Sequence, residues 1–234
     1  MNDLLVLWDV DYTLLSADGL GTRLYEHAFQ AMFGRELPTV APKAGRTERA
    51  IITDTLALAG IPEPHAQVDR FLAGLARQVA LVQGSVNAQV RPLAGASAAI
   101  TALAMASTVQ RQIRQSVLTG NMRALAVLKL GAAGLGDHLD LDVGAYGEAH
   151  EVRAELVSVA RLAARQAYGR DFGRSSTVLI GDTPLDVEAA LATGARAVGV
   201  ATGSFTGAQL AAAGAHSVLP DLTDTALVIA AVAG

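Results

Sequence analysis

The sequence predicts an α/β protein, a doubly wound parallel sheet that carries an inserted all-helical cap domain. Two observations predict this fold class. Short apolar runs of strand length alternate with helix-length amphipathic segments over most of the chain, and one long segment after the first run has helical periodicity throughout. Regular alternation of strands and helices is typical of a parallel sheet covered by helices on both faces.

The expected strands are short runs of Val, Ile, Leu and Ala that end in a polar residue, Gly or Pro. They are residues 4–10, 116–120, 139–145, 176–182, 195–203 and, more weakly, 216–220. The expected helices of the same unit are amphipathic segments between these runs. They are residues 93–106, 121–132, 150–168, 184–193, 206–213 and 222–232.

The segment after the first run contains helical patterns and no convincing strand. Its helical stretches are separated by Gly and Pro breaks, as expected for turns between helices. The breaks are Gly34 with Pro38, Pro42 with Gly45, and Gly60 with Pro62 and Pro64. We therefore expect residues 1–15 and 89–234 to form the core domain and residues 16–88 to form a helical cap domain.

Composition excludes several classes of protein. With 51% hydrophobic and 17% charged residues, the 234-residue chain is long and apolar enough to bury a sizeable core. A net charge of −4 without a basic cluster argues against a nucleic-acid partner. The absence of Cys excludes disulfides, thiolate metal sites and a Cys nucleophile. The N-terminus lacks a basic signal region, and no apolar stretch approaches the roughly 20 residues that span a bilayer, so we expect a cytoplasmic protein without membrane contact.

Polar residues follow three of the expected strands. They are Asp9 and Asp11, then Thr119, Gly120 and Asn121, and then Asp182 and Asp186. In open parallel sheets, ligands bind beyond the carboxyl ends of the strands, so these residues are expected to form one site.

The residue types at the strand ends indicate a chemistry. Four carboxylates in one place repel one another unless a cation holds them, and hard oxygen ligands without His or Cys suit Mg²⁺ with a substrate phosphate. A carboxylate can also act as a covalent nucleophile toward phosphorus. Thr119 and the backbone amides of the helix that follows it could bind the phosphoryl oxygens.

The same residues resemble a known pattern. Residues 9–13 read DVDYT, residue 119 is Thr and residues 181–186 read GDTPLD. This order resembles the haloacid dehalogenase superfamily, and residues 189–204, AALATGARAVGVATGS, are similar to its phosphoglycolate-phosphatase-like branch. The resemblance implies a Rossmann-like core, a helical cap of the C1 type, and Mg²⁺-dependent hydrolysis of a small phosphorylated metabolite.

The resemblance also implies a role for each acid. Asp9 would be the nucleophile, and Asp11 would protonate the leaving alcohol and then activate water. Asp9 and Asp182 would ligate Mg²⁺ by side chain, Asp11 by its backbone carbonyl, and Asp186 directly or through water. Thr119 would bind a phosphoryl oxygen. An Asp at position 11 favours phosphoester hydrolysis, because the dehalogenases and phosphonatases of the superfamily lack it.

The third motif of the superfamily is a basic residue, and here the chain departs from the commonest form. Its only lysines, Lys43 and Lys129, lie outside the segment expected to carry this motif. Arg153, at the start of the helix before the fourth strand, is the best placed substitute, with Arg161 and Arg165 as fallbacks. An Arg can neutralise phosphate charge and form paired hydrogen bonds to its oxygens.

Further substrate contacts are expected from both domains. Gly120 and Asn121 lie beside Thr119, and the cap loop PKAGRTERA offers Lys43 and Arg46. Both cations are also compatible with ordinary surface charges.

Other interpretations of single motifs remain open. Each acid or Thr at a strand end could be a helix cap, with Asp182 before Thr183-Pro184 as one example. A phosphomutase would share the nucleophile and the acid, although that branch usually has Gly where this chain has Tyr12. A phospho-acceptor or binding module, comparable to a receiver domain, is the non-enzymatic alternative.

Overall fold

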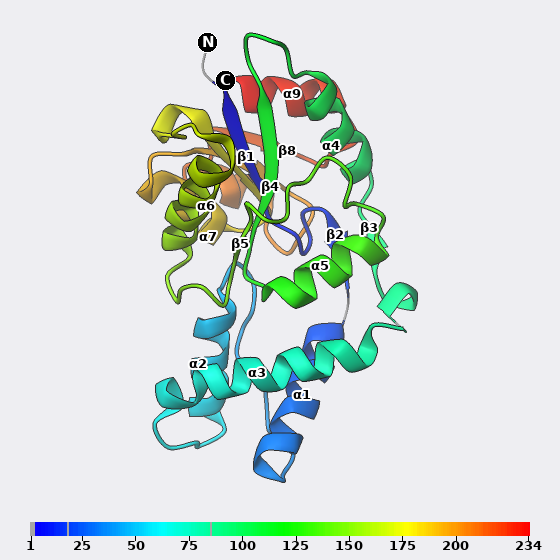
Figure 1. Ribbon diagram of the computed structural model, residues 1–234, viewed down its shortest axis with the longest axis vertical. Helices are drawn as coiled ribbons and strands as arrows, with labels where there is room; N and C mark the ends of the chain where they lie inside the picture. Colours follow the sequence, from blue (N-terminus) through cyan, green and yellow to red (C-terminus); the bar gives the residue numbers. More distant parts are fainter. Residues whose placement is uncertain (1–2, 18, 85) are drawn as a thin grey trace.

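The computed structural model describes residues 3–17, 19–84 and 86–234. Figure 1 shows two parts: a sheet with its flanking helices above, and a group of three helices below. The two parts are joined through the segments that leave and re-enter the sheet near its lower edge.

The larger sheet has six parallel strands in the order β5-β4-β1-β6-β7-β8. The strands are β1 (Leu4–Trp8), β4 (Ile113–Thr119), β5 (Ala145–Tyr146), β6 (Thr177–Gly181), β7 (Arg196–Val200) and β8 (Ser217–Leu219). All five residues of β1 are buried because β4 and β6 pair with its two edges and helices cover both faces. The predicted α/β fold class with a parallel sheet is confirmed.

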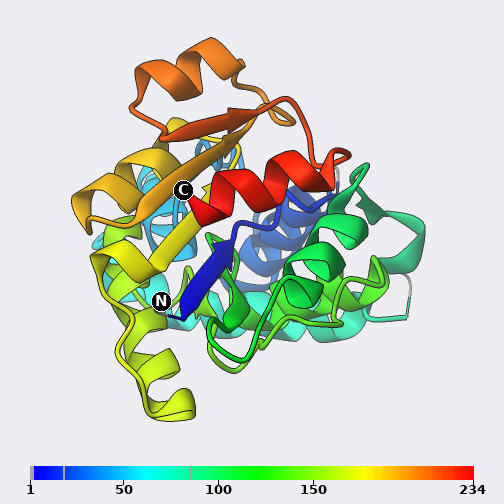
Figure 2. The ribbon, with the colours of Figure 1, turned by 90° about the horizontal axis from the view of Figure 1, so that it is seen from above.

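Helices cover both faces of this sheet. They are α4 (Ala96–Met105), α5 (Arg123–Ala132), α6 (Arg153–Tyr168), α7 (Pro184–Ala192), α8 (Gly207–Ala212) and α9 (Thr225–Ala233), with short 3₁₀ turns η1 (Val86–Ala88) and η2 (Arg174–Ser176). Alternate residues of β1 enter different cores, as the two-residue side-chain period of a strand requires. Trp8 packs with α4, α5 and α9, whereas Leu7 packs with α6 and α7. Figure 2 shows these helix layers on either side of β1.

The inserted segment consists of α1 (Leu20–Phe33), α2 (Glu48–Leu58) and α3 (Pro64–Val82). Their apolar faces meet in one core, in which the rings of Tyr25 and Phe71 lie 5.5 Å apart. These three helices occupy most of the expected cap, whose division from the core domain stays a prediction.

Two details differ from the expected elements. The strand expected at residues 139–145 is mostly turn, because the Asp140 side chain accepts the Asp142 N–H at 3.2 Å and closes the backbone locally. Only Ala145 and Tyr146 pair with β4. The expectation of no strand in residues 16–88 is wrong at Ser16. There β2 (Leu15–Ser16), before the inserted helices, pairs antiparallel with β3 (Arg91–Pro92), which follows them.

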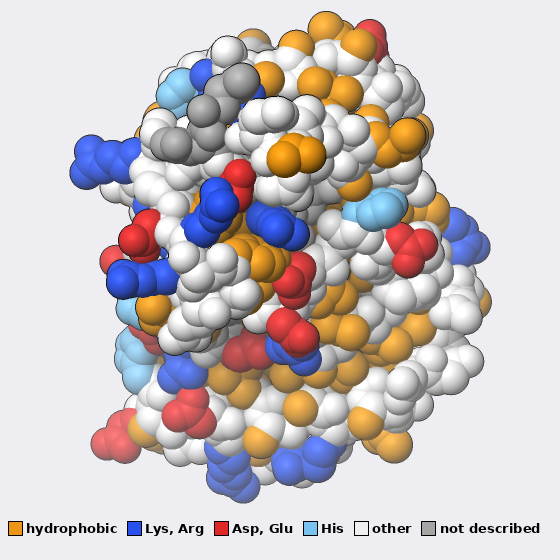
Figure 3. Space-filling model, turned by 45° about the horizontal axis from the view of Figure 1, so that its top comes forward, with side chains coloured by type: hydrophobic (Ala, Val, Ile, Leu, Met, Phe, Trp, Pro, Cys, Tyr) orange, Lys and Arg blue, Asp and Glu red, His pale blue; other side chains and the backbone are white. Residues whose placement is uncertain are grey.

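The surface carries no single-sign charge field on the face drawn in Figure 3, where basic and acidic side chains are interspersed. Within the described residues, no helix is both long and apolar enough to cross a membrane.

Candidate active site

Hydrogen bonds to the neighbouring strands fix the C-terminal end of β1. The Trp8 indole donates to Gln115 Oε1 at 3.0 Å, and the Asp9 N–H donates to the Ile180 carbonyl at 2.8 Å. Beyond it, Tyr12 adopts a left-handed conformation with φ of 57° and closes a turn through its N–H to the Leu15 carbonyl. The buried strand therefore brings Asp9 and Asp11 out at the carboxyl edge of the sheet.

A cavity of about 310 Å³ lies between this edge and the inserted helices. The candidate site residues that line it are Asp9, Asp11, Lys43, Arg46, Thr119, Gly120, Asn121, Arg153 and Asp182. Asp186 lies behind this surface and is 2% exposed. Residues separated by more than 100 positions in the chain thus meet at one cavity, as the strand-end argument predicts.

Three of the carboxylates form a buried cluster. One oxygen from each of Asp9, Asp182 and Asp186 lies within 4.8 Å of the others. Burial and the nearby Asp186 raise the pKa of Asp9 to about 7, although Arg153 lowers it. Burial, together with Asp9 and Asp186, raises the pKa of Asp182 to about 8. The ionised forms of both carboxyl groups are therefore disfavoured in the folded protein without a bound cation.

The charge balance of the site fits a divalent cation. Its four acids (Asp9, Asp11, Asp182, Asp186) face two paired cations, Lys129 and Arg153, so two negative charges lack a partner when all four acids are ionised. The Asp182 carboxylate accepts a long hydrogen bond from the Thr13 hydroxyl, at 3.4 Å. A small hard cation bound by Asp9 and Asp182 would compensate this charge, and oxygen donors of this kind suit Mg²⁺.

Arg153 is the basic residue nearest the expected nucleophile. Its Nη2 donates to Asp9 Oδ1 at 2.8 Å, and its Nε donates to Asp186 Oδ1 at 3.0 Å. Burial lowers the pKa of Arg153, but Asp186 and Asp9 outweigh this and hold it above its usual range. The fallbacks lie elsewhere: Arg161 donates to Thr177, and Arg165 is paired on the surface.

The helix-cap interpretation is wrong for Asp182, but Asp186 takes part in capping the same helix. Thr183 is the N-cap of α7, and Asp186 completes the capping box by accepting the Thr183 N–H at 3.1 Å. Asp186 therefore both caps a helix and holds Arg153. Asp182 is not the cap, because its backbone precedes the capping residue. Its carboxylate is therefore not used in capping this helix.

Thr119 and Asn121 do not cap α5, whose N-cap is Met122. The Thr119 hydroxyl accepts from the Asn121 side chain at 2.8 Å and from its N–H at 3.2 Å. The expectation that amides of this helix bind phosphate is wrong for the Met122 and Arg123 N–H groups. They already donate to carboxylates, the first to Glu48 and the second to Glu148.

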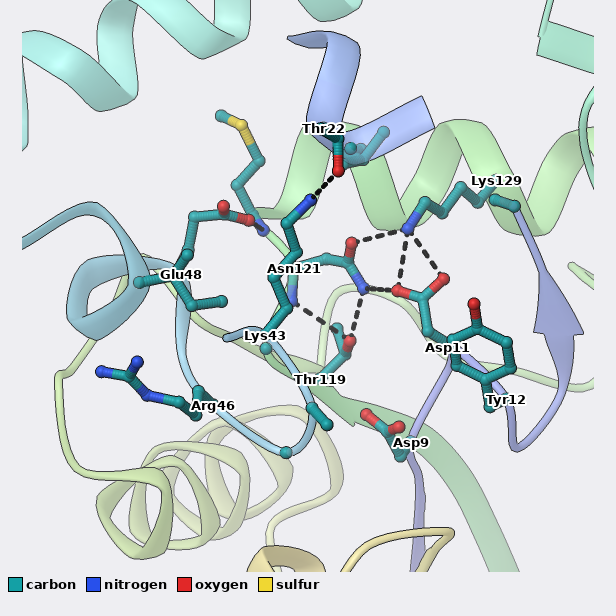
Figure 4. Close-up of a pocket in the computed structure, with 18 of the residues that line it drawn as sticks. Asp9, Asp11, Tyr12, Thr22, Lys43, Arg46, Glu48, Thr119, Asn121 and Lys129 are labelled. Carbon is teal, nitrogen blue, oxygen red and sulfur yellow. Dashed lines mark hydrogen bonds and ion pairs between the residues drawn. The ribbon is translucent and has the colours of Figure 1, made fainter. Parts of the chain in front are cut away.

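The connection between α1 and α2 approaches the sheet closely. A Cβ at Gly120 would stand 2.0 Å from the Arg46 carbonyl oxygen, so only glycine fits there. The Arg46 guanidinium is engaged with Asp54 at 2.6 Å, and in Figure 4 it lies apart from Asp9. Lys43 faces the cavity, donates to Thr22 at 2.8 Å, and has its pKa lowered by burial.

Two features of the site were missed from the sequence. Lys129 lies inside it, paired with Asp11, although its position in the sequence is outside the third motif. No spacing in the sequence could have found it, because its partner Asp11 lies 118 positions away. The buried pair of Tyr25 and Glu48, joined by a 2.6 Å hydrogen bond, carried no recognisable signal.

A family model matches the carboxyl-terminal part of the chain. Residues 152–225 match the family model of HAD-hydrolase-like proteins, a stretch that holds Arg153, Asp182 and Asp186. The superfamily resemblance drawn from the sequence is thereby confirmed, and with it the prediction of a hydrolase. No curated protein sequence matches the chain.

Solved structures share the fold over nearly the whole chain. A hydrolase from Pseudomonas syringae matches with a TM-score of 0.63 and 20% identity, covering 97% of this chain and 98% of its own. A predicted phosphatase from Clostridium acetobutylicum matches with a TM-score of 0.67 and 17% identity, covering 98% and 100%. A protein from Bacteroides vulgatus described as a candidate beta-phosphoglucomutase matches at 0.66 and 15% identity, covering 100% and 91%. At these identities the likeness concerns the fold.

Proposed function

We propose that this protein is a Mg²⁺-dependent phosphatase that hydrolyses a small phosphorylated metabolite, such as a phosphoglycolate- or sugar-phosphate-like compound, through an aspartyl-phosphate. The observation that carries the proposal is the meeting of Asp9, Asp11, Thr119 and Arg153 at one cavity beside a buried acid cluster. The proposal extends the family match, which concerns hydrolases in general.

Each residue has a defined task in this reaction. A carboxylate oxygen of Asp9 attacks phosphorus while the bond from phosphorus to the leaving oxygen breaks, and Asp11 donates a proton to that oxygen. Water then attacks the phosphorus of phospho-Asp9, Asp11 takes its proton, and inorganic phosphate and free Asp9 result. Thr119 donates to a phosphoryl oxygen, and Arg153 orients Asp9 from 2.8 Å. Bound Mg²⁺ would neutralise phosphoryl charge and the excess charge of the acids.

The cavity supports a small substrate. Its volume of about 310 Å³ is at the lower end for ligand pockets, which usually occupy about 300–1,000 Å³. Its lining combines the polar residues at the strand ends with apolar residues of the inserted helices, such as Leu24, Ile51 and Leu75. Lys43 offers a cationic contact for the leaving group.

The test is phosphate release by the purified protein from p-nitrophenyl phosphate and from a panel of phosphorylated metabolites. We expect turnover with Mg²⁺ and none with EDTA, and we expect Asp9→Asn to abolish it. Asp142→Asn is the matched control, since this carboxylate is 89% exposed and pairs only with Arg123 among the described side chains. An Asp9→Asn protein with wild-type turnover would refute the mechanism.

A phosphomutase is the second candidate, favoured by the structural likeness to the Bacteroides vulgatus protein. It would isomerise a sugar phosphate in the presence of a sugar bisphosphate and release little phosphate. A phospho-enzyme that persists for many minutes without turnover would instead identify a phospho-acceptor module. The same preparation distinguishes all three outcomes.

A further inference from the structure

Lys129 is a buried cation that the reaction described above does not use. It lies on α5, in the core part of the fold, and its side chain is 5% exposed. A lysine is rarely buried without a specific partner, because removing an ammonium group from water is costly. We propose that Lys129, together with Asn121, is a positioning residue that holds Asp11 in place for proton transfer. This inference rests on the proposed phosphatase function.

The contacts of Lys129 use all its hydrogen-bond donors. Its Nζ lies 2.8 Å from Asp11 Oδ1, 2.8 Å from Asp11 Oδ2 and 2.8 Å from Asn121 Oδ1. An ammonium group has three N–H bonds, so each finds one acceptor. Figure 4 shows Lys129 reaching Asp11 from the side away from Asp9. Lys129 is therefore bound to Asp11 through both carboxylate oxygens.

Asn121 connects this pair to the phosphoryl site. Its Nδ2 donates to Asp11 Oδ2 at 2.7 Å and to Thr119 Oγ1 at 2.8 Å, while its Oδ1 accepts from Lys129. The opposite amide orientation would turn NH₂ toward the ammonium group, so Lys129 determines which way Asn121 faces. In both of these hydrogen bonds the Thr119 oxygen accepts, which leaves its proton to donate to a phosphoryl oxygen.

Asp11 needs such support more than Asp9 does. Its side chain is 32% exposed, whereas that of Asp9 is 9% exposed, and Asp11 precedes the left-handed turn at Tyr12. Proton transfer requires the carboxyl within hydrogen-bond reach of the leaving oxygen, so rotation of Asp11 away from it slows the reaction. The two buried cations thus have different partners. Arg153 holds the nucleophile Asp9, and Lys129 holds the proton donor Asp11.

Aryl phosphates of similar shape but different leaving-group basicity test whether Lys129 acts on proton transfer by Asp11. A good leaving group departs with little help from a general acid, whereas a poor one depends on it. We expect Lys129→Met to lower kcat/KM for p-nitrophenyl phosphate by about 3-fold, and for phenyl and p-methoxyphenyl phosphate by at least about 10-fold, within the roughly 10²–10⁴-fold range of acid–base catalysis. Lys129→Arg should recover part of the loss.

A second measurement follows the water-attack step, which also uses Asp11. With p-nitrophenyl phosphate, Lys129→Met should release about one equivalent of nitrophenolate per enzyme in a rapid burst before slower turnover, because phospho-Asp9 accumulates. Lys129→Gln, which retains a donor without the charge, serves the same measurements if the methionine variant does not fold.

The control for loss of helix packing is Leu130→Ala. Leu130 is the next residue on α5, fully buried in the core and outside the cavity lining. This variant should lower the thermal midpoint and leave the ratio of the aryl phosphate activities unchanged.

Equal losses on all three aryl phosphates without a burst in the Lys129 variants, or an unchanged enzyme, would overturn the proposal. A change of ratio in Leu130→Ala equal to that in Lys129→Met would also overturn it. Failure of the proposed phosphatase function is recognised separately. In that case the wild-type protein releases no phosphate, or Asp9→Asn releases it at the wild-type rate.

Discussion

Raising the pH in the absence of metal should destabilise this protein through its acid cluster. The folded state raises the pKa of Asp9 to about 7 and that of Asp182 to about 8, from an ordinary 3.8. Between about pH 4 and pH 8 the folded protein therefore binds more protons at these groups than the unfolded chain does. Stability falls with rising pH wherever the folded state binds more protons, so this contribution is lost through that window.

The magnitude follows from the same values. A pKa difference of one unit corresponds to about 1.4 kcal/mol, so the contribution of Asp9 alone falls by about 2 kcal/mol between pH 5.5 and pH 8. For a chain of 234 residues this lowers the thermal midpoint by about 4–8 °C. Added Mg²⁺ should raise the midpoint more at pH 8 than at pH 5.5, because at pH 8 it displaces fewer protons from its ligands.

The assay uses the fluorescence of Trp8, the only tryptophan of the chain, which is fully buried beside Asp9. Thermal unfolding is followed in EDTA and in Mg²⁺ at pH 5.5 and pH 8. Comparison with Asp9→Asn isolates the contribution of Asp9, because both proteins contain the same five histidines and the same Asp182 and Asp186. A wild-type midpoint in EDTA that falls no more between pH 5.5 and pH 8 than that of the variant would refute the reasoning.

Three further predictions concern single substitutions. Asp9→Asn should be inactive yet unfold at a higher temperature than wild type in EDTA at pH 8, since it removes a buried repulsive charge; a lower midpoint there would contradict this. Arg153→Met removes the partner of Asp9 and Asp186, and should cost about 3–5 kcal/mol of stability by urea unfolding, with Mg²⁺ recovering part of it. Unchanged urea stability would show that the pair is not needed. Gly120→Ala should cost about 1–3 kcal/mol and raise KM, because its Cβ would meet the Arg46 carbonyl at 2.0 Å; wild-type kinetics would mean that the connection can move aside.

The fold class followed from the sequence because its signals are local. Apolar runs of strand length and helical periodicity arise from neighbouring residues, and their alternation restricts the topology to a parallel sheet. The same logic predicted that Asp9, Thr119 and Asp182 would meet, because parallel strands present their carboxyl ends at one edge. The strand expected at residues 139–145 was wrong because the Asp140 side chain closes a turn that alternating leucines conceal.

The pairings inside the site were decided by the tertiary structure alone. Arg153 meets Asp9 across 144 positions, and Lys129 meets Asp11 across 118, so no sequence spacing reveals either pair. Which cation serves which acid depends on how α5 and α6 pack against the sheet. The sequence by itself determined the strand edge at which charge gathers, because hydrophobic burial orients each strand. The assignment of partners required the folded core, because electrostatic pairing acts between atoms a few ångströms apart.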